Sequence, residues 1–564
     1  MKATKIFISL LLITNLAVPA MASENWVDTF LRRYDPSRTA ASTGSSSSST
    51  QVEQLLRTGE MPVTMGDVIN LMLDNNLNIR ADRFAPRSLY YQSLVFWQAL
   101  QPAFKFSANM ARDSSLSSSQ LNGASTRIQD TGLFDANVSQ LLPTGTSFTA
   151  DINMNRLLTN SNNSVFNPSY TSRATFTVGQ HLLQNRGRVV NMRQILEGRN
   201  TEKSSEAAFE LQLTTLIVQA QKSYWSLVFA AENLDVLQHQ LERAQVLLDQ
   251  NRQKVEIGTL AQADLFPTQG QVATVTDQLV QARYSVNSSE DQLKTLVSSD
   301  KDPSLFLMRL KALDLPTRPE SVRIPAYDEA LRIALENRPE IRQAQLDLRN
   351  KDIEIQYTNN QRKPVFDVTA SFDQNGLGGT QRRGFLLNSP PENVPGGVFN
   401  SLGQLFGYGY TGFSGGFNIT IPLDNKAANA AYQKALNDQR MSRGLMDSTI
   451  QAIALDVRNS LMAVEMYKSR IDTAKTAREL AEQTLEADQA KFDLGTGTIQ
   501  FVLNDQTALA QAQTNEVQII VNFTAALADL DRSMGMTLKK NNIELDRTLG
   551  PVATKVSSGP TLTS

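Results

Sequence analysis

The chain lacks cysteine, has only two histidines among 564 residues and carries a net charge of only −2. Without cysteine there are no disulfides, no thiolate metal sites and no cysteine nucleophile. Two histidines are too few to favour a histidine metal site or a Ser-His-Asp triad. Because 54 Lys and Arg offset 56 Asp and Glu, no basic field remains to attract nucleic acid. We therefore predict no enzyme, no cofactor, no metal and no nucleic-acid partner.

Long hydrophobic runs are also missing. The apolar stretch over 6–17 has about twelve residues, whereas a helix needs about 20 to cross a bilayer. Lys2 and Lys5 precede it and Ala20-Met21-Ala22 follows, which is the order of a secretory signal peptide. We predict a signal peptide over 1–22, with an N-terminal membrane anchor as the alternative. An N-terminal extension over 23–63 then contains a serine-rich linker.

The chain repeats itself. Shifted by 262 residues, Gly66–Arg80 lies over Asp328–Arg342, and the register continues without a gap to Ala108 over Ala370. A second shift of 237 residues lays "KVEIGT" over "KFDLGT". Turn residues and strand residues stay in register together, so an internal duplication is favoured over chance similarity between helices. The predicted parts are a first repeat over 64–300, a linker over 301–325, a second repeat over 326–537 and a tail over 538–564.

Both copies have the same order of elements. A short helix and a helix of about 22 residues come first, and the latter ends before Pro102 or Pro364 because proline cannot continue a helix. Two strands, a very long helix, a glycine turn at Gly258 or Gly495 and a last helix follow. The helices are expected over 65–76, 80–101, 188–257 and 261–299 in the first copy, and over 326–337, 342–363, 427–494 and 499–537 in the second.

The strands alternate apolar and polar side chains with a period of two. Their apolar positions include Phe104, Phe106, Phe366, Val368, Phe417 and Ile419. An apolar face with no second sheet to cover it, opposite a polar face, is typical of a transmembrane β-barrel. Four strands cannot close a barrel, and open edges are not tolerated in hydrocarbon. Several copies must then share one barrel; a soluble sandwich is the alternative.

The long helices carry a sustained seven-residue apolar repeat, which predicts coiled-coil packing. Leucine or alanine recurs every seven residues from Leu213 to Leu248, and Ile or Val from Ile450 to Ile471. At about 1.5 Å per residue such a helix is roughly 100 Å long. The two shorter helices of a copy together match its length, so each copy is expected to form a pair of rods.

This order of elements resembles the outer membrane factor family, the TolC-like exit ducts. The resemblance rests on the duplicated order and on the segments "LENRPEI", "ITIPL", "KVEIGTLAQADL" and "KFDLGTGTIQFVL". It implies a mainly α fold with a β-barrel: a homotrimer with a shared twelve-stranded barrel in the outer membrane and a periplasmic coiled-coil tunnel. The implied function is the passive channel of a tripartite efflux pump or a type I secretion system. The implied partners are a periplasmic adaptor and an inner-membrane pump or ABC transporter.

The chain departs from the family pattern in the first copy. A further candidate hairpin over 130–156 follows the first strand, with apolar positions that alternate around the turn "LPTGT". We expect it to extend the strands above the membrane; added barrel strands are the alternative.

The resemblance also implies a gate near the two glycine turns. Asp264 matches the family's carboxylate tie, whereas Phe492, Gly497, Phe501 and Asn504 replace its usual aromatic, arginine and two acidic residues. Asp505 is adjacent, but a shift of one residue turns a helical side chain by about 100°. We expect a constriction formed by apolar packing around Phe501; packed residues without a gating role are the alternative.

The competing functions for the whole protein are a periplasmic adaptor and a trimeric fibre.

Overall fold

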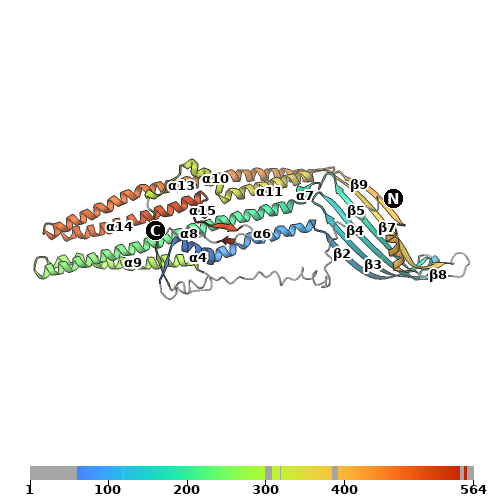
Figure 1. Ribbon diagram of the computed structural model, residues 1–564, viewed down its shortest axis with the longest axis horizontal. Helices are drawn as coiled ribbons and strands as arrows, with labels where there is room; N and C mark the ends of the chain where they lie inside the picture. Colours follow the sequence, from blue (N-terminus) through green and yellow to red (C-terminus); the bar gives the residue numbers. More distant parts are fainter. Residues whose placement is uncertain are drawn as a thin grey trace, which may run out of the picture. The chain divides into compact units, whose positions relative to one another are not determined.

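The computed structural model describes residues 60–546, apart from 119, 299–305, 307, 318, 384–391 and 395, and residues 552–554. The predicted signal peptide and most of the predicted N-terminal extension and tail lie outside these residues. Nearly all described residues belong to one compact unit, Met61–Ser564. Within this unit a large antiparallel sheet adjoins one end of a set of long helices (Figure 1). This combination agrees with the predicted helical fold that carries a sheet.

The helices are α4 (Met65–Asn75), α5 (Leu77–Asp82), α6 (Phe84–Val95), α7 (Arg188–Asn191), α8 (Arg193–Glu256), α9 (Leu265–Val297), α10 (Tyr327–Asn337), α11 (Pro339–Gln361), α12 (Val398–Phe406), α13 (Lys426–Asp493), α14 (Ile499–Ser533) and α15 (Thr537–Lys540). The large sheet contains β2 (Ala103–Leu116), β3 (Thr126–Leu141), β4 (Thr146–Thr159), β5 (Phe166–His181), β7 (Val365–Arg383), β8 (Glu392–Val394) and β9 (Thr411–Thr420). Two small sheets pair β1 (Glu60–Val63) with β6 (Arg309–Ala312) and β10 (Glu544–Asp546) with β11 (Val552–Thr554).

Two very long helices organise the helical part. α8 has 64 residues and α13 has 68, which corresponds to lengths of about 100 Å. The predicted seams are packed: Leu213, Ala220 and Leu227 are buried in α8, and Val457, Val464 and Ile471 in α13. α6 and α9 pack along α8, while α11 and α14 pack along α13. Each long helix therefore lies against the two shorter helices that follow and precede it in its own half of the chain, as predicted, and α8 also packs against α11 and α14.

One predicted helix is broken. The helix expected over 80–101 is divided at Arg83 into α5 and α6, and ends in a 3-10 turn over Phe96–Leu100. Pro86 explains the break, because it has no N–H to donate to the carbonyl of Asp82. The corresponding helix of the second copy starts at Pro339, where the missing N–H costs nothing, and continues unbroken to Gln361.

The sheet corrects the prediction for the additional hairpin. β3 pairs with β2 from Ala103↔Ser139 to Leu116↔Thr126, and β4 pairs with β5 from Thr146↔Gln180 to Leu157↔Ser169. The hairpin therefore lies inside the sheet, and the expectation that it extends above the sheet is wrong. Its strands have the same length and alternation as their neighbours, so they satisfy the backbone groups along the whole of β2 and β5. The long strands among the described residues run in the order β2-β3-β4-β5-β7-β9, which makes six rather than the expected four. The twelve-stranded barrel implied by the resemblance takes four strands from each of three copies, whereas six long strands are described here.

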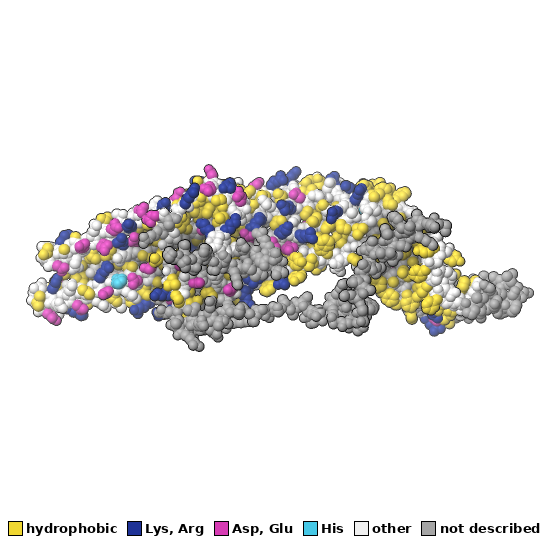
Figure 2. Space-filling model, in the orientation of Figure 1, with side chains coloured by type: hydrophobic (Ala, Val, Ile, Leu, Met, Phe, Trp, Pro, Cys, Tyr) yellow, Lys and Arg dark blue, Asp and Glu magenta, His cyan; other side chains and the backbone are white. Residues whose placement is uncertain are grey.

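One face of the sheet is apolar and exposed. Phe104, Phe106, Phe417 and Ile419 are all more than half exposed, and Phe366 and Val368 pair with Ile419 and Phe417 on the same face. Figure 2 shows hydrophobic side chains gathered over the sheet and charged side chains over the helices. The opposite face is polar, and includes an ion pair of 3.1 Å between Arg173 and Asp373. α12 covers the apolar face of β7 at the end of the strand that is farther from the long helices. The two elements approach closely there, because the Cβ of an alanine at Gly376 would lie 2.1 Å from the carbonyl oxygen of Ser401.

Throughout the described part of the chain, no helix has both the length and the apolar character needed to cross a membrane.

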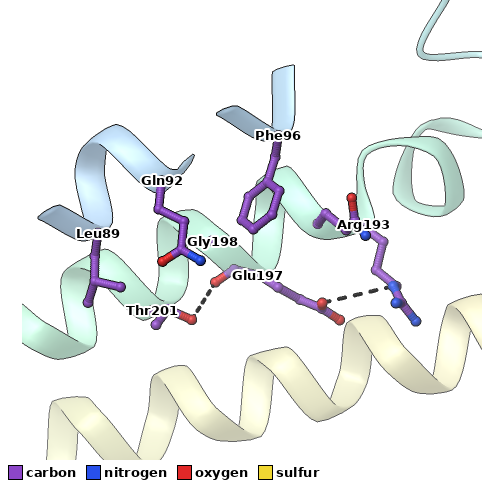
Figure 3. Close-up of a pocket in the computed structure, with 8 residues that line it drawn as sticks. Leu89, Gln92, Phe96, Arg193, Glu197, Gly198 and Thr201 are labelled. Carbon is purple, nitrogen blue, oxygen red and sulfur yellow. Dashed lines mark hydrogen bonds and ion pairs between the residues drawn. The ribbon is translucent and has the colours of Figure 1, made fainter. Parts of the chain in front are cut away.

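A glycine inside α8 lets α6 approach closely (Figure 3). The Cβ of an alanine at Gly198 would lie 3.0 Å from two carbons of the Phe96 ring. Beside this contact, Leu89, Gln92 and Thr201 line a cavity of about 290 Å³. At Gly444, the glycine inside α13, an added Cβ would meet nothing within 4 Å. Close packing thus requires a glycine at position 198. Within this chain, packing does not require one at position 444.

These two glycines give a matched prediction. Gly444→Ala is expected to stabilise the protein by about 0.5–1 kcal/mol, because alanine loses less backbone entropy in a helix. Gly198→Ala gains the same propensity but must displace the Phe96 ring, so its stabilisation is expected to be smaller or reversed. The midpoint of thermal unfolding, followed by helical circular dichroism, measures both. Equal stabilisation by the two variants would contradict the packing constraint at Gly198.

Candidate gate at the tip of the helices

The two glycine turns have the same backbone construction. Gly258 and Gly495 have φ values of +79° and +76°, a left-handed conformation that other residues adopt at a cost. At each turn the carbonyl of a lysine, Lys254 or Lys491, accepts hydrogen bonds from the backbone N–H and side-chain hydroxyl of the threonine five residues later. The sequence therefore located both chain reversals correctly.

Gly497 fills a crowded position in the second turn. A Cβ at this residue would lie 2.9 Å from the backbone nitrogen of Phe492 and 3.1 Å from Cβ of Lys491. The Gly497 N–H also donates to the Lys491 carbonyl at 3.0 Å. A larger side chain would push α14 away from the end of α13, so the arginine of the family pattern does not fit this turn as it is built here.

Phe492 belongs to a small apolar core at the tip. It is buried with Leu247, Ile499, Val502 and Leu503, which come from α8 and α14. This cluster joins the end of α13 to the start of α14 and to α8. Phe492, which stands at the position of the family's usual aromatic residue, is thus part of an apolar core.

Lys254 connects the two turns, which sequence reasoning did not predict. Its Nζ lies 4.2 Å from the centroid of the Phe492 ring and 3.4 Å from Oδ1 of Asp493. The positions of Lys254 and Lys491 in the repeated segments "KVEIGT" and "KFDLGT" were visible in the sequence. The contact itself was not, because 238 residues separate Lys254 from Phe492.

Asp264 does not form this connection. It is the N-cap residue of α9 and half-buried, and its side chain makes no hydrogen bond or ion pair with the residues that the structure describes. Within one chain, the polar tie between the two turns is therefore the contact of Lys254 with Phe492 and Asp493.

The three remaining gate candidates lie on the first turns of α14. Phe501 is 57% exposed, whereas the next two residues, Val502 and Leu503, are buried. Asn504 is exposed and its Oδ1 accepts a hydrogen bond of 3.0 Å from Gln500 Nε2. Phe501 and Asn504 thus face away from the tip core.

Asp505 is half-buried and faces a second carboxylate. Burial raises its pKa, and the negative charge of Asp488 on α13 raises it further. Asp488 itself is held by Lys491 at 2.5 Å, which lowers the Asp488 pKa. Oδ2 of Asp505 is buried without a hydrogen-bond partner among the described residues. Asp505 therefore carries a charge that the fold accommodates poorly.

Histidines and acidic residues form no metal centre in the part of the chain that the structure describes. Nδ1 of His181 lies 2.6 Å from Oδ1 of Asp367 and links β5 to β7. His239 is exposed near Asp235 and Glu242 on α8.

Comparison with known proteins identifies the family to which the chain belongs. The family model described as "Outer membrane efflux protein" matches residues 68–299 and 330–536. The chain belongs to the outer membrane efflux protein family. Its function is therefore that of an outer membrane efflux channel, and the match gives no support to the periplasmic adaptor alternative.

Individual relatives agree with this assignment. The channel is 23% identical to the outer membrane protein TolC of Escherichia coli over 350 residues, which cover 62% of this chain and 67% of TolC. It is 21% identical to nodulation protein T of Rhizobium leguminosarum over 345 residues, or 60% and 68% of the two chains. Among solved structures, the CmeC outer membrane channel of Campylobacter jejuni superposes with a TM-score of 0.57 at 15% identity, covering 84% of this chain and 86% of CmeC. The MtrE channel of Neisseria gonorrhoeae superposes with a TM-score of 0.56 at 18% identity, covering 84% and 89%.

The Asp505–Asp488 contact predicts a pH effect. Because the pKa of Asp505 is raised on folding, ionisation of this group opposes folding, and its unfavourable contribution grows as the pH rises above the unfolded value of about 3.9. Asp505→Asn is expected to leave the thermal unfolding midpoint little changed near pH 4 and to raise it at pH 7–8. Calorimetry of both proteins between pH 4 and pH 8 measures the difference. Asp264→Asn, at the other turn, serves as control, and an equal gain there would assign the effect to net charge instead.

Proposed function

We propose that three copies of this efflux channel assemble around one axis as a passive duct through the outer membrane and the periplasm. The observation that carries the proposal is a sheet with an exposed apolar face and two outer edges, β2 and β9, without a partner strand among the described residues. Six strands are fewer than the roughly eight that close a barrel. Backbone groups at an open edge are not tolerated in hydrocarbon, so further copies must supply the missing partners.

The internal duplication fits this assembly. The family model matches the chain twice, once in each predicted repeat. Asn76 and Arg338, which coincide under the 262-residue shift, are both N-cap residues, and the coinciding Ile79 and Ile341 are both buried. Two similar halves per chain give a trimer with six similar units around the tunnel, which supports a continuous helical wall.

The two faces of the sheet fit opposite surroundings. Phe104, Phe106, Phe366, Val368, Phe417 and Ile419 share the exposed apolar face and are proposed to contact lipid. The polar face, with Arg173 and Asp373, then lines the water-filled lumen. The helices extend from the opposite end of this unit into the periplasm, which the predicted signal peptide allows the chain to reach.

The tip supplies a surface for partners. Ile257 and Leu494 are the C-cap residues of α8 and α13, and are 73% and 81% exposed. Exposed apolar residues at coinciding positions of the repeat support docking of a periplasmic adaptor. Through it the duct would receive cargo from an inner-membrane pump or ABC transporter, in efflux or in type I secretion.

The resting entrance is proposed to close by apolar packing. Phe501 is exposed in the single chain, on the side of α14 that faces away from the tip core. In a trimer three such rings around the axis would form an apolar constriction, which gates by excluding water rather than by charge. Asp264, Phe492, Gly497 and Asn504 would shape the surrounding wall.

The assembly is tested by the mass of the purified protein in detergent. Three chains of 62.3 kDa, each less its signal peptide, are expected. A stable, membrane-inserted monomer would contradict the shared barrel.

The gate is tested by conductance in planar lipid bilayers. Phe501→Ala should raise the closed-state current because it removes the apolar constriction. Phe501→Asp should keep the channel narrow but introduce block by divalent or trivalent cations, since three clustered carboxylates bind such ions.

Asn504→Ala tests the neighbouring wall position, which is exposed one turn farther along α14. It is expected to raise the closed-state current less than Phe501→Ala does. Wild-type channels that are already blocked by micromolar trivalent cations, together with an unchanged conductance in Phe501→Ala, would refute the apolar gate. Asp505 would then be the better candidate for the constriction.

A further inference from the structure

We infer that this channel closes an eighteen-stranded barrel, in which β2 of one copy pairs with β9 of the next. The inference rests on the proposed trimer and adds to it the number of strands, the partner of each edge and a wider opening. It starts from the position of the β3–β4 hairpin, which separates β2 from β5. Three sheets of six long strands give eighteen.

The two edge strands run in the directions that this closure requires. Every neighbouring pair of long strands in the sheet is antiparallel. With an even number of strands, β2 and β9 run in opposite directions, so β9 of one copy meets β2 of another in the antiparallel sense. β2 has 14 residues and β9 has 10, and about 9–11 tilted residues cross a bilayer.

The apolar band slants across the sheet as a tilted barrel requires. Residues that are partners on successive strands form a row across the sheet. The row that starts at Phe104 in β2 passes through Val138, Ala150, Phe176, Phe372 and Phe413. In β2 the apolar stretch begins at this row and continues to Met110, away from the helices. In β7 the apolar stretch starts at Phe366 and ends at this row, with Phe372. The band therefore shifts by about six residues between the two sides of the sheet.

This shift closes the barrel with an ordinary geometry. Six residues per copy give a shear of about 18 for eighteen strands, which corresponds to a strand tilt of about 35°. Barrels have tilts of roughly 35–45°, so neither the strands nor the apolar band needs to be distorted. The slant includes β3 and β4, whose apolar residues, such as Phe134 and Ile152, continue the band between β2 and β5.

The band also gives the register between copies. The apolar stretch of β2 lies at the same height as that of β9 in the neighbouring copy when Phe104 is opposite Ile419 and Met110 is opposite Phe413. Within one chain, Phe366 already lies opposite Ile419 and Phe372 opposite Phe413. Phe104 coincides with Phe366 under the 262-residue shift, so the contact between copies would repeat the β7–β9 contact.

The additional strands widen the outer opening. At equal tilt the diameter of a barrel grows in proportion to the number of strands, so eighteen strands give an opening about 1.5-fold wider than twelve. The barrel would then pass bulkier cargo, such as folded peptides or small proteins, and selection by size would be left to the tip of the helices.

Cysteine pairs that share Phe104→Cys test the strand order, on a chain without native cysteine. Phe104→Cys with Val138→Cys should form a disulfide within one chain, because the two residues are paired. Phe104→Cys with Phe176→Cys or Val178→Cys should form none, because β2 and β5 lie three strand spacings, or about 14 Å, apart. Phe104→Cys with Ile419→Cys should link different chains into covalent dimers and trimers on denaturing gels.

The outcomes separate this inference from the proposed trimer. A disulfide from residue 104 to 176 or 178 within one chain, without one to residue 138, would place the hairpin outside the sheet and overturn the inference. A trimeric mass without a link between residues 104 and 419 of different chains would overturn the predicted edge contact. Electron cryo-microscopy of the trimer in lipid nanodiscs should count eighteen strands, and twelve would refute the inference. A monomeric mass would instead refute the proposed trimer itself.

Discussion

The hydrogen-bonding groups at the edges of the sheet set the strongest constraint on this molecule. Each unpaired backbone group in hydrocarbon costs several kcal/mol, and an edge strand presents a whole row of them. Among the residues that the structure describes in a single chain, β2 and β9 have one neighbouring long strand each. The proposed trimer satisfies both edges at once with the same contact repeated three times. The helices are continuous with these strands, so a symmetric barrel would impose the same symmetry on the tunnel.

Polar contacts at the junction connect the sheet to the helices and transmit this constraint. The side chain of Asn360, near the end of α11, accepts a hydrogen bond of 2.7 Å from the backbone N–H of Asn185, in the loop between β5 and α7. Near it, His181 and Asp367 bridge β5 and β7. Arg193 at the start of α8 binds Glu354 of α11 at 2.7 Å. Because this region is cross-linked by several contacts, movement of the rods is expected at the opposite end, near the glycine turns.

The sequence predicted features that depend on local periodicity. Periods of two and seven located the strands and the long helices, and Gly258 and Gly495 located the reversals, because only glycine adopts their backbone conformation cheaply. The neighbours of β3 and β4 were not predicted correctly. Alternation shows that a segment is a strand but not which strand it joins, and the hairpin could pair internally in either position. The Lys254–Phe492 contact was missed for the same reason, since it depends on how two distant helix ends meet.

The contacts at the tip differ in strength, and this difference determines how a gate could move. The apolar core around Phe492 and Val502 is buried, so separating α14 from α13 would expose several large side chains to water. By contrast, Lys254 and Asp493 keep 32% and 57% of their side chains exposed, and such an ion pair contributes about 0–1 kcal/mol. The cation–π contact with Phe492 adds about 0.5–1 kcal/mol at an exposed site. We infer that α13 and α14 move as one rod. Separating this rod from the end of α8 would break the two weak Lys254 contacts and would also expose Leu247 of α8, which is buried in the same core. The apolar contact is therefore the larger part of the free energy that such a movement would cost.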